Sequence, residues 1–271
     1  MSGVPLALVV GSALAGILAA LSVTSSPQRL LRENHRGVRV PAVLGLAVLG
    51  GTVVGSLTGL LVRAYRPGPI LVALLVGLSV LAAAGLVDDL GPDGPRGFRG
   101  HLGDMARGRA TTGILKLVVG VAAGATVALL IGGGALRVIA AAVLVAVSVN
   151  LWNALDVAPG RSLKWALLVL VPVLVMTREV ALGVAAAATL GASMGALPFD
   201  LTERGMLGDA GANPLGFVVG TGLAAVLPTA GVLAAAAAAV LLQAAAETFT
   251  ISRLIEVVPP LRWFDRLGRR P

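Results

Sequence analysis

The sequence predicts an all-α bundle of transmembrane helices, and three observations point to this fold class. Apolar residues make up 57% of the 271 residues, and Asp, Glu, Lys and Arg together make up only 13%, whereas soluble domains carry about 25% charged residues. Runs of Leu, Val, Ala and Gly recur with the length of a membrane-spanning helix, about 20 residues. Most of the charged residues gather between these runs or at their ends. We therefore expect a polytopic protein of the lipid bilayer, with one integral membrane domain over residues 1–271.

About nine spans are expected along the chain. The first run lacks the basic n-region and the clear cleavage site of a signal peptide, so we expect it to remain as a span. The second follows the basic loop "RGVRVP", and a tight turn at "GGG" separates the fourth from the fifth. The sixth is short and contains Pro172, and the last boundary rests on Thr229–Gly231. The expected spans are 4–24, 41–62, 69–87, 111–132, 135–152, 163–177, 179–198, 214–230 and 231–251.

The basic residues predict the orientation. With nine spans, the loops alternate between two sides, and one side with its adjoining span ends holds 17 of the 21 Lys and Arg residues. The positive-inside rule places that side in the cytoplasm, with the N-terminus outside and the C-terminus inside. We expect a plasma (inner) membrane location and no nucleic-acid partner, because this asymmetry accounts for the net charge of +8. The absence of cysteine excludes disulfides and cysteine-ligated metals.

On the predicted cytoplasmic side, three loops carry acidic residues close to the end of an apolar helix. They contain Asp88 and Asp89, then "NLWNALDVAPGR" with Asp156, then "MLGDAGANPLG" with Asp209. A charged side chain in bilayer hydrocarbon costs about 2.5 kcal/mol or more. Carboxylates so close to the apolar runs therefore indicate a functional site. Carboxylates with nearby Arg and Lys suit a Mg²⁺ ion and a bound diphosphate. Ordinary solvated helix ends are the alternative, and a transporter is disfavoured because no carboxylate pair lies in mid-span.

Four motifs in order resemble the polyprenyl-phosphate N-acetylhexosaminyl-1-phosphate transferases, which form glycosyltransferase family 4. The family includes the phospho-N-acetylmuramoyl-pentapeptide transferase of peptidoglycan synthesis. The resemblance covers most of the chain and implies a membrane bundle with a cytoplasmic active face. The motifs are "RGVRVPAVLG" (36–45), "GLVDDL" (85–90), "NALDVAPG" (153–160) and "LGDAGAN" (207–213).

The resemblance assigns roles to the acidic residues. Asp88 and Asp89 match the pair proposed to bind Mg²⁺ or to deprotonate the acceptor phosphate. Asp209 matches the Mg²⁺ ligand of the family. Asn153 and Asp156 match the Asn and the first Asp of the nucleotide-side loop. We therefore expect catalytic roles for the four aspartates, with Asp209, Asp88 and Asp89 as metal ligands.

Basic residues are the expected substrate contacts. Lys116 matches a family residue that contacts phosphates, although its spacing from the Asp pair is longer here. We also expect Arg99, His101 and Arg161 to bind substrate, with a solvated loop position as the alternative for His101. The tail at 262–270 is expected to be a solvated end, with binding of anionic lipid or uridine diphosphate as the alternative.

The chain also departs from the family pattern. Pro159 stands where the family has its second nucleotide-loop Asp, and Asn213 stands in the loop that usually continues with Ser. The only histidines are His35 and His101, so the His-rich loop of the pentapeptide transferase is missing and that substrate is not expected.

The sequence thus predicts a Mg²⁺-dependent transferase that moves a sugar-1-phosphate from a UDP-sugar to polyprenyl phosphate in cell-envelope glycan synthesis. The alternative is a catalytically silent relative that binds polyprenyl phosphate or scaffolds an envelope-synthesis complex. The departures from the family pattern favour this alternative. The sequence leaves a homodimer and a monomer both open.

Overall fold

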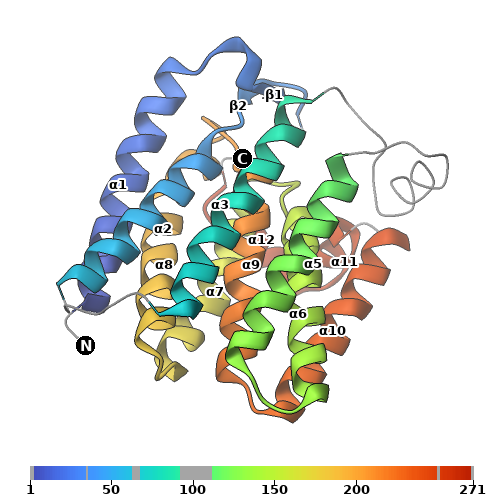
Figure 1. Cartoon of the computed structure of the whole chain (residues 1–271). Helices are drawn as coiled ribbons and strands as arrows, with labels where there is room; N and C mark the ends of the chain where they lie inside the picture. Colours follow the sequence, from blue (N-terminus) through green and yellow to red (C-terminus); the bar gives the residue numbers. More distant parts are fainter. Residues whose placement is uncertain (1–2, 35, 63–67, 92–111, 249–250, 270–271) are drawn as a thin grey trace.

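The computed structural model describes residues 3–34, 36–62, 68–91, 112–248 and 251–269, and these residues form an all-α bundle (Figure 1). One short antiparallel hairpin and one 3-10 turn accompany the helices. The helices are α1 (Gly3–Ser25), α2 (Leu44–Leu61), α3 (Pro69–Leu90), α5 (Thr112–Ile131), α6 (Ala135–Leu155), α7 (Arg161–Met176), α8 (Val180–Leu201), α9 (Asp209–Val226), α10 (Thr229–Thr248), α11 (Ile251–Val257) and α12 (Pro259–Arg266); the turn is Gln28–Leu30 and the strands are β1 (Leu31–Glu33) and β2 (Arg39–Pro41).

Each of the nine apolar runs expected from the sequence coincides with one long helix, so the all-α membrane fold class is confirmed. Among the described helices, six are long and apolar enough to cross a membrane: α1, α2, α3, α6, α8 and α10. The apolar part of α5 is shorter, α7 has 16 residues, and α9 opens with polar residues. The count of nine spans and their orientation remain predictions.

Helix α9 is the centre of the bundle. In Figure 1, α1, α2 and α8 lie on one side and α5, α6 and α10 on the other, with α3 and α9 between them. The neighbours that pack against α9 include α2, α3, α5, α6, α7 and α8. Fourteen of its 18 residues are buried. Close packing through small residues is seen most clearly in α8, whose buried residues are mostly Ala and Gly and which packs against α1 and α2.

Charged side chains of neighbouring helices hold both ends of α9. At its C-terminus, the Arg137 guanidinium from α6 donates to the carbonyls of Ala224 (2.8 Å) and Leu227 (3.0 Å). At its N-terminus, the carboxylate of Asp89 from α3 accepts hydrogen bonds from backbone N–H groups. A cation at the C-terminal end and an anion at the N-terminal end both complement the helix dipole, so α9 is stabilised in the bundle interior.

The hairpin is an element that the sequence analysis did not anticipate. Strands β1 and β2 pair antiparallel, with Arg32 opposite Val40. The Asn34 side chain closes the turn by accepting from the N–H groups of Arg36 and Val38, both at 2.9 Å. Its amide donates to Glu203 at 2.8 Å, which ties the hairpin to the loop that precedes α9. The hairpin therefore lies at the same end of the molecule as the start of α9.

Candidate active site

The acidic residues of the three predicted loops meet around the first turn of α9. Asp88 and Asp89 come from the last turn of α3, Asp156 follows the end of α6, and Asp209 is the first residue of α9. These segments are far apart in the sequence, and the packing of α3 and α6 against α9 brings them together. The structure therefore brings the four aspartates together in an acidic cluster at the start of α9, and their catalytic roles stay predictions.

Lys116 is the cation at the centre of this cluster. Its Nζ atom, carried by α5, lies 2.6 Å from Asp88 Oδ2 and also contacts Asp209 Oδ2. Asn153 Nδ2 lies 3.5 Å from the same Asp209 oxygen. The side chain of Lys116 is 13% exposed, so the group is largely enclosed but still reachable from solvent. Asp88 and Asp209 thus direct one oxygen each at a single cationic point.

Asp89 has different partners from its neighbour. One carboxylate oxygen accepts from the N–H of Asp209 at 3.1 Å, and the other accepts from the N–H of Ala210 at 3.0 Å. The first N–H groups of a helix have no partner within the helix, and a carboxylate there is favoured by the helix dipole. Asp89 therefore caps α9 and fixes the backbone that carries Asp209.

Asp156 is bound to the residue that precedes α9. Its Oδ2 atom accepts from the N–H of Gly208 at 3.0 Å. Burial raises the pKa of Asp156 well above its usual range, and the nearby carboxylates of Asp200, Asp209 and Asp89 raise it further. Carboxyl groups whose pKa is shifted by burial together with specific charged neighbours are common in functional sites.

Two glycines allow the segments to approach this closely. Gly208 has a φ of +69°, in the left-handed region that suits glycine, and a Cβ atom there would lie 2.9 Å from Asp89 Oδ2. Gly85, one turn before Asp89, lies against the backbone of Asp209, and a Cβ atom there would collide with it. The glycines thus set the distance between α3 and the start of α9.

The side chains fit a Mg²⁺ site made by two carboxylates. Among the described residues, no three acidic or histidine side chains converge closely enough to form a complete metal site by themselves. Mg²⁺ often takes only one or two carboxylates and completes its shell with water and substrate phosphates. Asp88 and Asp209 already converge on one cation, so they suit this ion, whereas Asp89, expected as a third ligand, uses both oxygens to cap α9.

A family model described as glycosyl transferase family 4 matches residues 71–229, which is more than half of the chain. The chain belongs to glycosyl transferase family 4. The match covers α3 to the start of α10 and includes the whole acidic cluster. No curated protein matches the sequence. Membership in glycosyl transferase family 4 confirms the resemblance noted above and indicates a membrane transferase.

The remaining predicted contacts of this glycosyl transferase family 4 member are not all in the cluster. Arg161 is buried, and its guanidinium pairs with Asp265 and donates to Ser252. Its described hydrogen bonds pack the C-terminus against α7, and its contact with substrate stays a prediction. Arg99 and His101 lie outside the described residues.

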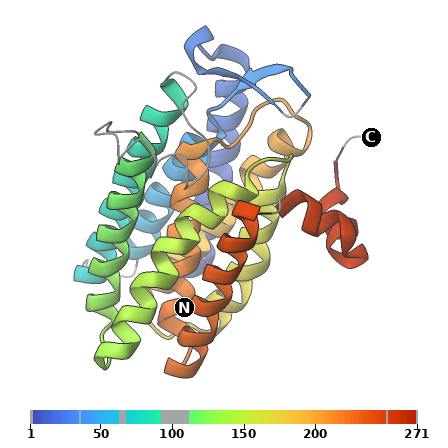
Figure 2. The same cartoon turned by 90° about the vertical axis from the view of Figure 1, so that its right-hand side faces the viewer.

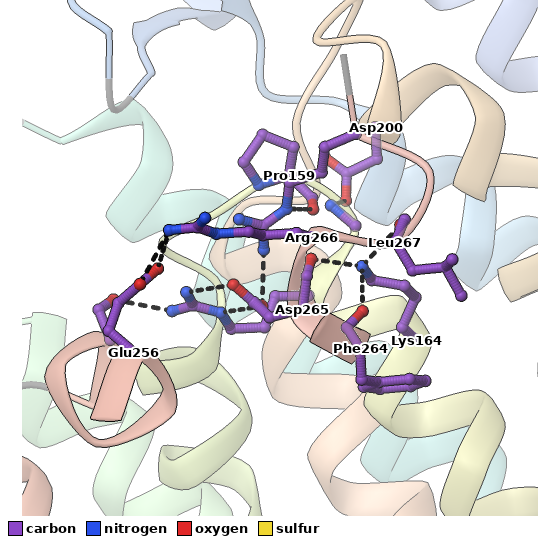
Figure 3. Close-up of polar contacts among 12 residues, drawn as sticks. Pro159, Lys164, Asp200, Glu256, Phe264, Asp265, Arg266 and Leu267 are labelled. Carbon is purple, nitrogen blue, oxygen red and sulfur yellow. Dashed lines mark hydrogen bonds and ion pairs between the residues drawn. The ribbon is translucent and has the colours of Figure 1, made fainter. Parts of the chain in front are cut away.

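The C-terminal residues correct an expectation from the sequence. Asp265, in the tail expected to be solvated, is 1% exposed and joins Arg161 and Arg269 in an ion-pair cluster (Figure 3). The sequence alone does not predict this cluster, because Asp265 lies about a hundred residues from Arg161 along the chain. The one signal available was an aspartate within an otherwise basic tail.

Proposed function

We propose that the protein transfers a sugar-1-phosphate from a UDP-sugar to polyprenyl phosphate at the cytoplasmic membrane surface. In this reaction an oxygen of the lipid phosphate forms a bond to the β-phosphorus of the UDP-sugar. The bond between the β-phosphorus and the bridging oxygen breaks, UMP leaves, and the sugar diphosphate remains on the lipid. The convergence of Asp88, Asp209 and Lys116 at the start of α9 is the observation that carries this proposal.

Each cluster residue has a task in the proposed reaction. Asp88 and Asp209 hold Mg²⁺, which when bound neutralises charge on the diphosphate. Lys116 exchanges its carboxylate contacts for a substrate phosphate, since an ammonium group suits either partner. Asn153 and Asp156 line the nucleotide side, and Asp89 keeps Asp209 in place through the cap on α9. Positioning and charge neutralisation supply most of the catalysis in phosphoryl transfer.

A catalytically silent relative that binds polyprenyl phosphate is the second candidate. One observation favours it: Lys116 already neutralises the two carboxylates that would hold the metal. A protein that used Lys116 in this way permanently would keep the fold and a cationic contact for a lipid phosphate without the metal. The departure at Pro159 points in the same direction.

The deciding experiment is UMP release by the purified protein in lipid nanodiscs. The mixture contains Mg²⁺, polyprenyl phosphate and a panel of UDP-sugars. We expect at least one sugar to release UMP, and Asp209→Asn to lower that rate by about 10²-fold or more. Glu256→Gln, which alters an exposed ion pair on α11, is the matched control and should leave the rate unchanged. No UMP from any sugar, with polyprenyl phosphate still bound, would establish the silent relative.

A further inference from the structure

The last helices of the chain form the C-terminal strap, which we define as residues 251–269. It comprises α11, α12 and the three residues that follow. Figure 2 shows α11 and α12 projecting from the side of the bundle beside the end of α10. The strap lies outside the segment that matches the family model, residues 71–229. The family match therefore says nothing about the contacts between the strap and the bundle.

The strongest contact of the strap is a buried ion pair. Asp265 receives two hydrogen bonds from Arg161 at the start of α7, with Nε–Oδ1 at 2.7 Å and Nη2–Oδ2 at 3.0 Å. Arg269 donates to the same carboxylate at 2.6 Å. The side chains of Asp265 and Arg161 are 2% and 4% exposed. Removal of one partner from a buried pair leaves an uncompensated charge and is strongly destabilising, so this contact fixes α12 against α7.

Lys164, one turn further along α7, holds the end of α12 (Figure 3). Its Nζ donates to the carbonyls of Phe264 (3.0 Å), Asp265 (2.6 Å) and Leu267 (3.0 Å). These carbonyls are at the C-terminal end of α12, where a cation is favoured by the helix dipole. Two cations at the start of α7 thus hold the strap in one orientation.

The strap also reaches the loop between α6 and α7. Arg269 Nε donates to the carbonyl of Pro159 at 2.9 Å. The next N–H, from Gly160, donates to Asp200 Oδ2 at 3.0 Å. The same loop begins with Asp156, whose carboxylate holds Gly208 at the start of α9. A continuous set of hydrogen bonds and short chain segments therefore connects Asp265 to the acidic cluster.

We propose that Asp265 is a positioning residue that acts through Arg161 and Arg269 to hold the loop 156–160 in shape for the nucleotide. The role of that loop as the nucleotide side of the site rests on the function proposed above. The contact between the strap and the loop is independent of that function, because it follows from the hydrogen bonds described above. The strap thus makes the nucleotide side of the site depend on residues at the far end of the chain.

Amide hydrogen exchange of the full chain in nanodiscs tests the structural part. In Asp265→Asn, peptides that cover 153–161 should exchange faster by about tenfold or more. This factor corresponds to a modest part of the free energy that is lost when a buried ion pair loses one partner. Arg269→Gln removes the contact with Pro159 but keeps the Arg161–Asp265 pair, and it should have the same effect on the loop. Glu256→Gln on the strap should change nothing, and peptides from α1 report whether the fold is intact. Unchanged exchange in the loop in both variants, with a loosened strap, would overturn the inference.

Steady-state kinetics test the functional part. For a UDP-sugar that the wild type turns over, Arg269→Gln should raise the KM for the UDP-sugar by about tenfold and leave the KM for polyprenyl phosphate within about twofold. A fall in kcat with both KM values unchanged would contradict a positioning role toward the nucleotide. If the wild type turns over no UDP-sugar, the proposed function fails while the exchange experiment still decides whether the strap holds the loop.

Discussion

Asp88 and Asp89 are adjacent in the chain, but their side chains have different partners. Asp89 caps α9, whereas Asp88 faces Lys116 in a partly exposed position. Loss of a capping side chain costs about 1 kcal/mol, and the N–H groups left unpaired at this partly buried site add to that cost. We expect Asp89→Ala to lower the thermal unfolding midpoint clearly, and Asp88→Ala to lower it less while still reducing turnover. Differential scanning fluorimetry in detergent measures the unfolding midpoint of each variant, and UMP release measures the turnover. Equal losses of stability in the two variants would contradict the division of roles.

At the scale of elements, the contact between α3 and α9 depends on the missing side chain at Gly85. A Cβ atom there would collide with the backbone of Asp209. Overpacking typically costs about 1–3 kcal/mol, and here it would also move Asp88 away from Asp209. We expect Gly85→Ala to be destabilised by that amount and to lose Mg²⁺-dependent UMP release.

Gly120→Ala in α5 is the matched control for this substitution. Its Cβ atom would meet only Val149, at an ordinary distance of 3.8 Å, and alanine is the better helix former. We therefore expect stability equal to or above that of the wild type. An equal loss in both variants would mean that glycine matters for general flexibility and not for the approach of α3 to α9.

The C-terminal strap should respond to acid. Burial acts to raise the pKa of Asp265, but the hydrogen bonds and charge of Arg161 outweigh it, helped by Arg269, and the net pKa is lower than the usual 3.8. A carboxyl group with a lowered folded-state pKa contributes stability above its unfolded-state pKa, and the contribution is lost as the pH falls through the folded-state pKa. We expect the protection of strap amides, corrected for the pH dependence of intrinsic exchange, to be steady from neutral pH to about pH 4 and to fall below it.

Asp265→Asn separates this effect from general acid unfolding. The variant should show lower protection of strap amides at neutral pH and a smaller loss of protection below about pH 4, because it has lost the titrating group. If the wild type and the variant keep a constant difference in protection across this range, Asp265 is not the group responsible.

At the scale of the whole molecule, the distribution of basic residues predicts the side on which the acidic cluster lies. The chain has no cysteine, so single cysteines can be introduced without background. With an impermeant maleimide on intact cells, we expect Ser26→Cys and Glu203→Cys to stay unlabelled and Gly134→Cys to react. The reverse pattern would invert the orientation and place the cluster outside the cell.

The sequence predicted the long helices and the acidic cluster for the same physical reason. A run of apolar residues predicts a membrane span. A carboxylate at the end of such a run is costly in a membrane unless it has a partner or a function, so Asp88 and Asp209 were candidates for the site. The hairpin could not be predicted in this way, because strands of three residues carry no alternating pattern. The partners of Asp265 could not be predicted either, since tertiary contacts alone distinguish a buried aspartate in a tail from a solvated one.

The position of α9 has a consequence for how the protein is made. Its residues are mostly buried, both of its ends depend on side chains from α3 and α6, and it is not among the described helices with the length and hydropathy to cross a membrane unaided. Helices α3 and α6 precede α9 in the chain and are synthesised first, so the surfaces against which α9 packs exist before α9 is made. We expect residues 209–226, placed alone in a host protein with glycosylation reporters, to fail to integrate into microsomes, whereas residues 180–201 integrate. We therefore expect the helix at the centre of the molecule to insert only together with the helices that are synthesised before it.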